Sequence, residues 1–131
     1  MELLSEYIHE LTEDTYLDEF TVREKQMKLP GIKHKWAGRL MRSKIKLSEL
    51  FSKRRKVITE LAGKLIKESP VTISQPTAES KVKSLDIIIT MDKDIEEMKL
   101  VIEFLEKTER TLSSMTFDIK NITEIMKLEL Q

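Results

Sequence analysis

Apolar and basic side chains follow two separate sides of one helical surface in residues 33–67, and this pattern constrains the fold more than any other. The apolar positions are spaced three, four or seven residues apart, which places them on one side of a helix. They are Trp36, Leu40, Leu47, Phe51, Ile58, Leu61 and Leu65. Because Lys and Arg recur at similar spacings, we expect one amphipathic helix, roughly 50 Å long, with a basic ridge.

The charge of this stretch is far from balanced. It contains twelve Lys and Arg and two acids, a net charge of +10, whereas the whole chain has 23 basic and 23 acidic residues. Such cations repel one another unless an anionic partner neutralises them, which favours a polyanion-binding surface over a merely solvated helix. The candidate nucleic-acid-binding residues are Lys35, Arg39, Arg42, Lys46, Lys53, Arg54, Arg55, Lys56, Lys64 and Lys67.

Trp36 lies inside the basic cluster, beside Lys35 and Arg39. An aromatic ring among cations can stack on an unpaired base. The same ring also begins the apolar side of the helix, and Leu40 and Leu47 continue that line. The spacing favours the apolar role, and base stacking is the alternative.

Composition and motifs exclude several classes of protein. The chain of 131 residues has no Cys, three Gly and three Pro, and 35% of its residues are charged, which is typical of long helices. It has no apolar run that spans a bilayer and no signal-peptide pattern, so we expect a cytoplasmic protein without a membrane partner, with association with the nucleoid as the alternative. Catalytic motifs are missing, and His9 and His34 have no companion at metal-ligand spacing. We therefore expect neither an enzyme nor a metal or cofactor.

An acidic arm precedes the basic helix. Residues 1–22 contain seven acids and no Lys or Arg, and their apolar spacing predicts a short amphipathic helix. These acids are suited to compete with nucleic acid for the basic ridge or to dock a basic protein; a solubilising terminus is the alternative. Thr21 and Glu24 fit a capping box that opens a second short helix, which we expect to end before Pro30.

A heptad pattern organises the C-terminal part. Residues 70–80 are rich in Pro, Ser and Thr and predict a linker. Residues 85–89 contain three β-branched isoleucines, which favour an extended conformation. From Thr90 onward, apolar residues seven apart predict a seam over about five repeats, and therefore self-association, with packing inside one chain as the alternative. The candidate oligomerisation residues are Met91, Met98, Leu105, Leu112, Ile119 and Met126.

These features predict an all-α fold in one helical domain, residues 1–131, that assembles into an oligomer. Its parts are an acidic arm and short helix, a long basic amphipathic central helix, a linker and C-terminal oligomerisation helices. Their expected ranges are 1–29, 31–69, 70–89 and 90–131.

Three short motifs occur in a distinctive order. Residues 23–36 enter the central helix through Lys-Leu-Pro and then Lys-Trp, residues 91–98 open a helix with Asp, Lys and Glu, and residues 117–121 read Phe-Asp-Ile-Lys-Asn. Together with the acidic N-terminus and the chain length, they resemble the UvsY family of recombination mediators from T-even-type tailed phages.

The resemblance implies a non-enzymatic mediator that forms a ring-like homo-oligomer, roughly six or seven subunits, through its C-terminal region. Such a protein binds single-stranded DNA regardless of sequence. It helps load a RecA-type recombinase onto strands covered by single-strand binding protein, in a phage-infected bacterium. The family's DNA-binding element corresponds to residues 61–65, where Lys64 is the one charged residue, so the run 53–56 is a second candidate. Thr116 replaces the glycine that usually precedes the C-terminal phenylalanine.

Two other classes of function compete with this interpretation. One is a coiled-coil scaffold whose basic helix binds an acidic protein. The other is a regulator that binds duplex DNA, which is disfavoured because no helix–turn–helix pair of the usual short lengths is visible.

Overall fold

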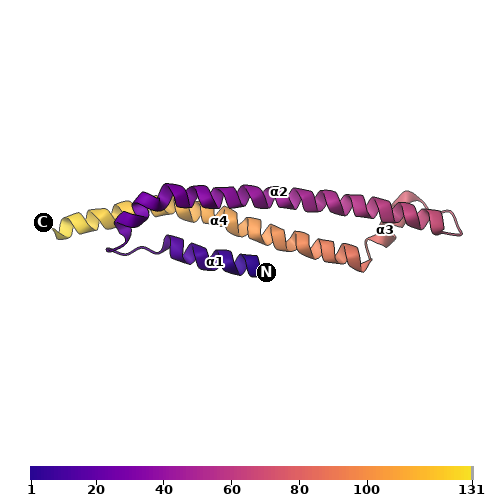
Figure 1. Cartoon of the computed structure of the whole chain (residues 1–131), viewed down its shortest axis with the longest axis horizontal. Coiled ribbons are helices and arrows are strands. Elements are labelled where there is room, and N and C mark those ends of the chain that lie inside the picture. The colour runs from indigo at the N-terminus through magenta and orange to yellow at the C-terminus, as the bar shows by residue number, and fades with distance from the viewer. Residues whose placement is uncertain (131) are drawn as a thin grey trace. The chain divides into compact units, whose positions relative to one another are not determined.

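A computed structural model describes residues 1–130 as four helices joined by short connections. They are α1 (Glu2–Thr15), α2 (Val22–Glu68), α3 (Gln75–Val82) and α4 (Asp86–Glu129), shown in Figure 1. The all-α prediction is confirmed, including its long central and C-terminal helices. Two compact units share α2 and α4: unit 1 contains Met1–Ser43 and the chain from Leu100 onward, and unit 2 contains Lys44–Lys99.

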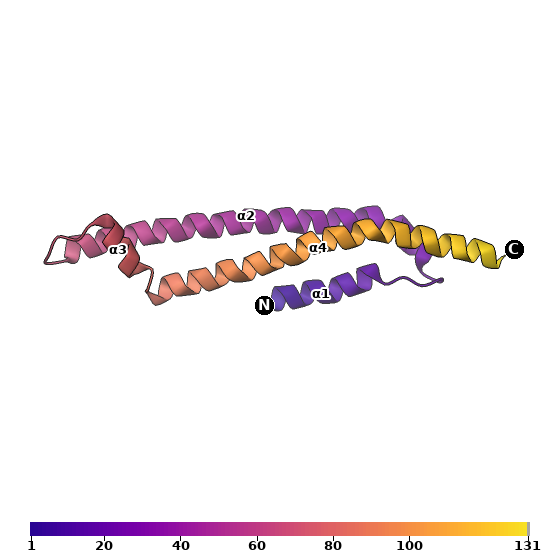
Figure 2. The ribbon, with the colours of Figure 1, turned by 180° about the vertical axis from the view of Figure 1, so that it is seen from behind.

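Unit 1 brings together α1, the first part of α2 and the last part of α4, which lie side by side in Figures 1 and 2. Its core is formed by residues spaced three, four or seven apart on α2 and α4, as amphipathic helices require. These buried residues are Val22, Leu29, Trp36, Leu40, Val101, Leu105, Leu112, Met115 and Ile119. The predicted apolar side of the central helix is therefore confirmed at Trp36 and Leu40.

Unit 2 is a smaller core closed by α3. Ile58 and Ala62 of α2 pack with Ala78 and Val82 of α3 and with Ile88 of α4. Ser74 caps α3 by accepting a hydrogen bond from the amide of Thr77, and a proline occupies the first turn, where its missing N–H costs nothing. Phe51, predicted on the buried side, is instead 41% exposed, with the Lys99 ammonium 5.6 Å from its ring centroid.

The predicted helix boundary at Pro30 is wrong. Helix α2 runs through this proline without interruption from Val22 to Glu68. A proline inside a helix removes one backbone hydrogen bond and bends the helix, and Figure 1 shows α2 bending near its N-terminal end. Val22 and Leu29 are both buried on the N-terminal side of the proline, and their packing offsets its cost.

The predicted linker over residues 70–89 is also wrong in most of its length. It contains α3, and α4 begins at Asp86 rather than at Thr90. The segment 85–89, whose β-branched residues favour an extended chain, is helical from Asp86 onward because this conformation buries Ile88 completely in unit 2. Packing here outweighs the β-propensity of its three consecutive isoleucines. Helix α4 then continues unbroken past Thr116 to Glu129.

The predicted capping box at the start of α2 is replaced by a different cap. The Thr21 hydroxyl bonds to Asp18, and one carboxylate oxygen of Asp18 accepts from the amides of Phe20 and Thr21. A hydrogen bond from the Tyr16 hydroxyl is the main reason that the pKa of Asp18 is lowered. Glu24, freed from the capping role, forms an ion pair with Lys28 one turn later.

Candidate nucleic-acid interface

Five exposed lysines form a stripe along the part of α2 that belongs to unit 2. From the first to the last they are seven, three, eight and three residues apart, and these spacings keep them on one side of the helix. Within residues 1–130 none of them has an ion-pair partner in the chain. We call these residues the lysine stripe: Lys46, Lys53, Lys56, Lys64 and Lys67. Glu49 and Glu60 lie on the same side and are the stripe's two acids.

The two arginines in the run 53–56 do not belong to this stripe. Arg54 is half-buried, and its Nε donates a hydrogen bond to Asp92 of α4, so its charge is already neutralised within unit 2. Arg55 is exposed, but two residues after Lys53 it lies about 200° further around the helix. The helical period alone separates Arg55 from Lys53, but a local run of sequence could not show that Asp92 neutralises Arg54.

In unit 1, the predicted binding residues Lys35 and Arg39 are covered by α1. The Lys35 ammonium lies 2.6 Å from a carboxylate oxygen of Asp14 and 3.2 Å from one of Glu10. The Arg39 guanidinium donates to the other oxygen of Glu10. The acidic arm is therefore not a loose terminus. It is a helix whose carboxylates form ion pairs with two cations of the basic helix. The separation of acidic and basic residues along the sequence indicated that the arm and the basic helix could interact in this way.

Trp36 is completely buried at the centre of the same contact. Its Nε1 donates a 2.8 Å hydrogen bond to Asp14, and its ring meets Tyr7 of α1 and Phe104 of α4 edge to face. The guanidinium of Arg39 lies over the rings of both Tyr7 and Trp36. The predicted apolar role of Trp36 thus holds, and base stacking requires α1 to move away first.

Arg42, one turn after Gly38, is exposed, and its guanidinium lies back along α2. A Cβ atom at Gly38 would come within 3.2 Å of the Arg42 Nη1. The absence of a side chain at Gly38 therefore leaves room for this guanidinium. Arg42 adds a further exposed cation to unit 1.

Neutralising Glu10 with acid should loosen α1. The hydrogen bond from Arg39, and secondarily contacts with Lys35, lower the pKa of Glu10 below its ordinary value of 4.5. The stabilisation from this carboxylate is therefore fully present above pH 4.5 and is lost as the pH falls through the lowered pKa. We expect acrylamide quenching of Trp36 fluorescence to rise over that acidic range. Glu10→Gln should show high quenching already at neutral pH, and an equal response of both proteins would contradict the assignment.

The predicted oligomerisation residues divide into two groups. Leu105, Leu112 and Ile119 are buried inside unit 1 of a single chain. Met91, Met98 and Met126 are partly exposed. The first group therefore packs within the chain, as the alternative interpretation of the heptad pattern required. Other apolar residues of α4 remain outside the core: Phe117, Ile125 and Leu128 are exposed.

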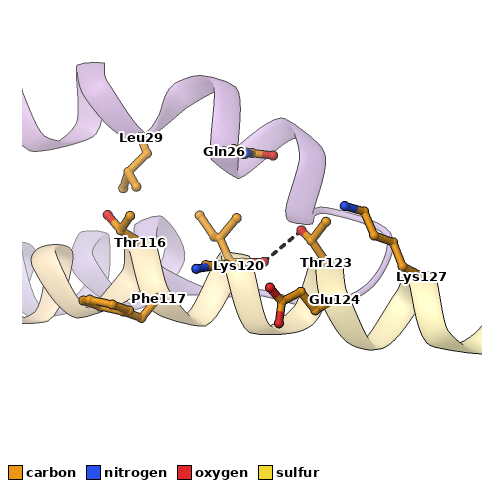
Figure 3. A pocket seen from close by; sticks show the side chains of 9 residues that line it. Gln26, Leu29, Thr116, Phe117, Lys120, Thr123, Glu124 and Lys127 are labelled. Atoms are coloured by element: carbon orange, nitrogen blue, oxygen red, sulfur yellow. Dashed lines mark hydrogen bonds between the residues drawn. The ribbon is translucent and has the colours of Figure 1, made fainter.

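A cavity of about 440 Å³ lies between the first turns of α2 and the end of α4, within unit 1 (Figure 3). Leu29 points from α2 toward α4, while Lys120, Glu124 and Lys127 follow α4 along the opening. Its polar rim carries Lys120, Glu124 and Lys127, so it is less strongly positive than the lysine stripe.

The family comparison decides which class this helical chain, with its basic central helix, represents. Residues 10–130 match the family described as "Recombination, repair and ssDNA binding protein UvsY". The chain belongs to the UvsY family. Members of this phage family are non-enzymatic recombination mediators that bind single-stranded DNA.

Solved UvsY structures share the fold. Two crystal structures of the bacteriophage T4 recombination mediator protein UvsY are similar to this chain, in lattice types IV and II. The first has a TM-score of 0.79 at 13% identity, over 96% of this chain and 98% of that one. The second has a TM-score of 0.75 at 14% identity, over 97% of each chain. No curated protein sequence matches this chain. Among residues 1–130, none of the helices combines the length and the apolar character that a membrane span requires.

Proposed function

We propose that this chain is a recombination mediator that binds single-stranded DNA along the lysine stripe of α2. In this role it helps load a RecA-type recombinase onto strands covered by single-strand binding protein, in the cytoplasm of a phage-infected bacterium. The observation that carries the proposal is the lysine stripe itself, five exposed cations without partners among the described residues of a UvsY family member.

The chemistry of the stripe fits phosphate contacts rather than base reading. Lysine is a compact charge on a flexible stem, and it binds phosphates without the paired donors that recognise a base edge. Each lysine that meets a phosphate releases condensed counterions, so affinity depends on salt and not on sequence. Glu49 and Glu60 interrupt the stripe, which keeps the affinity of one protomer modest.

Assembly through the C-terminal region would combine several weak stripes into one strong binding surface. A strand that contacts several protomers gains affinity from the high local concentration of the next site. Because the heptad residues Leu105, Leu112 and Ile119 are buried in the protomer, we assign self-association to the apolar residues that α4 leaves exposed. Phe117 and Leu128, each about 70% exposed, are the strongest candidates.

Replacing Phe117 and Leu128 by serine should lower the assembled mass without unfolding the protomer. Both side chains are outside the core, so the helical content and melting temperature should change little. Sedimentation velocity measures the mass, and Ile87→Ser, which removes a half-exposed isoleucine from unit 2, is the matched control. An unchanged mass in the double variant would exclude this surface.

The mediator role is tested with a recombinase. Oligo-dT is first covered with single-strand binding protein, and the DNA-dependent ATP hydrolysis of a RecA-type recombinase is then measured with and without this protein. We expect the lag before hydrolysis to shorten with the wild-type chain and to stay long with Lys53→Ala/Lys56→Ala/Lys64→Ala. A lag that the wild-type protein leaves unchanged would contradict the mediator role while leaving DNA binding intact.

A second function, binding of an acidic protein by the basic helix, is favoured by one observation. Helix α1 is itself an acidic segment, and it is seated on Lys35 and Arg39. A scaffold of this kind would bind polyglutamate as well as it binds oligo-dT, whereas a mediator would prefer the nucleic acid.

A further inference from the structure

We propose that α1 is a displaceable cover over a second single-strand site, formed by Lys35, Trp36 and Arg39. A strand would occupy it by placing phosphates where the carboxylates of Glu10 and Asp14 now lie, and a base where Tyr7 now meets Trp36. The inference rests on the proposed binding of single-stranded DNA, and it adds a site that is closed in the free protein.

The first support is the chemistry of the contact. Carboxylates of α1 form ion pairs with Lys35 and Arg39 and accept a hydrogen bond from the Trp36 indole. A carboxylate oxygen of Asp14 lies 2.6 Å from Lys35 Nζ and 2.8 Å from Trp36 Nε1. A phosphate oxygen is likewise an anionic hydrogen-bond acceptor and can take either donor. The site therefore already holds, in carboxylate form, the kind of ligand that a nucleic-acid backbone supplies.

The second support is the way in which α1 is held. It has no buried residue, and its N-terminus has no side-chain cap. Leu3 and Ile8 remain exposed, and the apolar contact of α1 with unit 1 is made by side chains that are only partly buried, Leu4, Tyr7 and Leu11. Contacts between partly exposed charges are weakened by salt and by competing ions, and elements with few buried contacts open most readily.

The third support is what remains when α1 leaves. Phe104 of α4 still packs against the Trp36 ring, with centroids 6.4 Å apart, and keeps the indole in place. The side that met Tyr7, whose ring centroid is 5.5 Å away, becomes free. The Arg39 guanidinium lies over the same indole, 4.6 Å from the ring centroid, and loses its second contact, with the Tyr7 ring, when α1 leaves. An indole beside a guanidinium is a platform on which an unpaired base can stack.

Trp36 is the one tryptophan of the chain, so its fluorescence reports directly on the cover. Saturating oligo-dT should quench the emission of Trp36, because a base stacks on the ring, and an abasic strand of equal length should only increase its access to acrylamide. Binding measured by anisotropy of the labelled strand, with Trp36 emission and acrylamide access both unchanged, would overturn the cover and leave the proposed function standing. No binding of either strand would overturn the proposed function, and the second site with it.

A charge-matched pair of variants tests the cover independently. Glu10→Gln/Asp14→Asn keeps the size of both side chains and removes the anions, and it should raise the affinity for oligo-dT about fivefold, because less of the protein is closed. Glu2→Gln/Glu6→Gln makes the same change in net charge on exposed positions of α1 and should change the affinity less than about twofold. Equal effects of the two variants would mean that general charge, not the cover, governs binding. Polyglutamate that quenches Trp36 as oligo-dT does would reassign the site to an acidic protein segment.

Discussion

Replacing Lys53, Lys56 and Lys64 together by alanine lowers the affinity of the protein for oligo-dT on the order of a hundredfold at about 0.1 M salt. This result is expected because the three lysines are exposed on one side of α2 and have no partner within the described chain. Each phosphate contact with a single strand contributes about 0.7 to the slope of log affinity against log salt, so the slope should become shallower by about two. Fluorescence anisotropy of a labelled strand across a salt series measures both quantities.

Arg55→Ala is the control for that experiment. It removes one exposed positive charge from the same run of sequence, but on the opposite side of the helix from Lys53. It should change the affinity less than Lys53→Ala does. If the two single variants weaken binding equally, the net charge of the run, rather than the lysine stripe, determines affinity.

Leu105→Ala destabilises the protomer by about 2–5 kcal/mol, a large share of the free energy of unfolding of a small domain. The reason is that Leu105 is fully buried in unit 1, so its truncation leaves a cavity in the core. Urea denaturation followed by circular dichroism measures the loss.

The contrast with an exposed leucine makes this prediction specific. Leu128→Ala, at a position 69% exposed, should change the stability of the protomer by less than about 0.5 kcal/mol. The effect of Leu105→Ala should be independent of protein concentration, because Leu105 packs within one chain. A loss that appears only as the protein concentration is raised would place Leu105 between protomers instead.

Much of the fold could be predicted from the period of the apolar residues. The spacing of Trp36 and Leu40, and of Leu105, Leu112 and Ile119, reports which side of each helix is buried, because only that side meets other helices. The spacing does not report whether the neighbouring helix belongs to the same chain. For that reason the heptad residues were expected between protomers, whereas three of them pack inside one.

The errors at element boundaries have a common cause. Pro30 and the isoleucines before Thr90 carry local preferences against a helix, yet both segments are helical. The side chains beside them, Leu29 and Ile88, are buried, and this burial is decided by distant parts of the chain. Local propensity therefore gave the wrong result wherever tertiary packing opposed it.

The charge pattern of the candidate site could be predicted from the sequence, but which of its cations are exposed and which are paired with acids could not. Sequence identified the basic helix and the acidic arm, and the structure pairs the two through Glu10 and Asp14. It did not identify Asp92 as the partner of Arg54, which lies 38 residues away along the chain. What distinguishes a free cation from a neutralised one is the neighbour supplied by folding.

The measurement that tests the central claim most directly compares single-stranded with double-stranded DNA. Labelled oligo-dT and a duplex of the same length are titrated with the wild-type protein across a salt series, and binding is followed by anisotropy. We predict tight binding of oligo-dT that weakens steeply with salt, and weaker binding of the duplex at every salt concentration. A folded protein that binds neither strand at low salt, or that prefers the duplex, would contradict the assignment of the lysine stripe as a single-strand path.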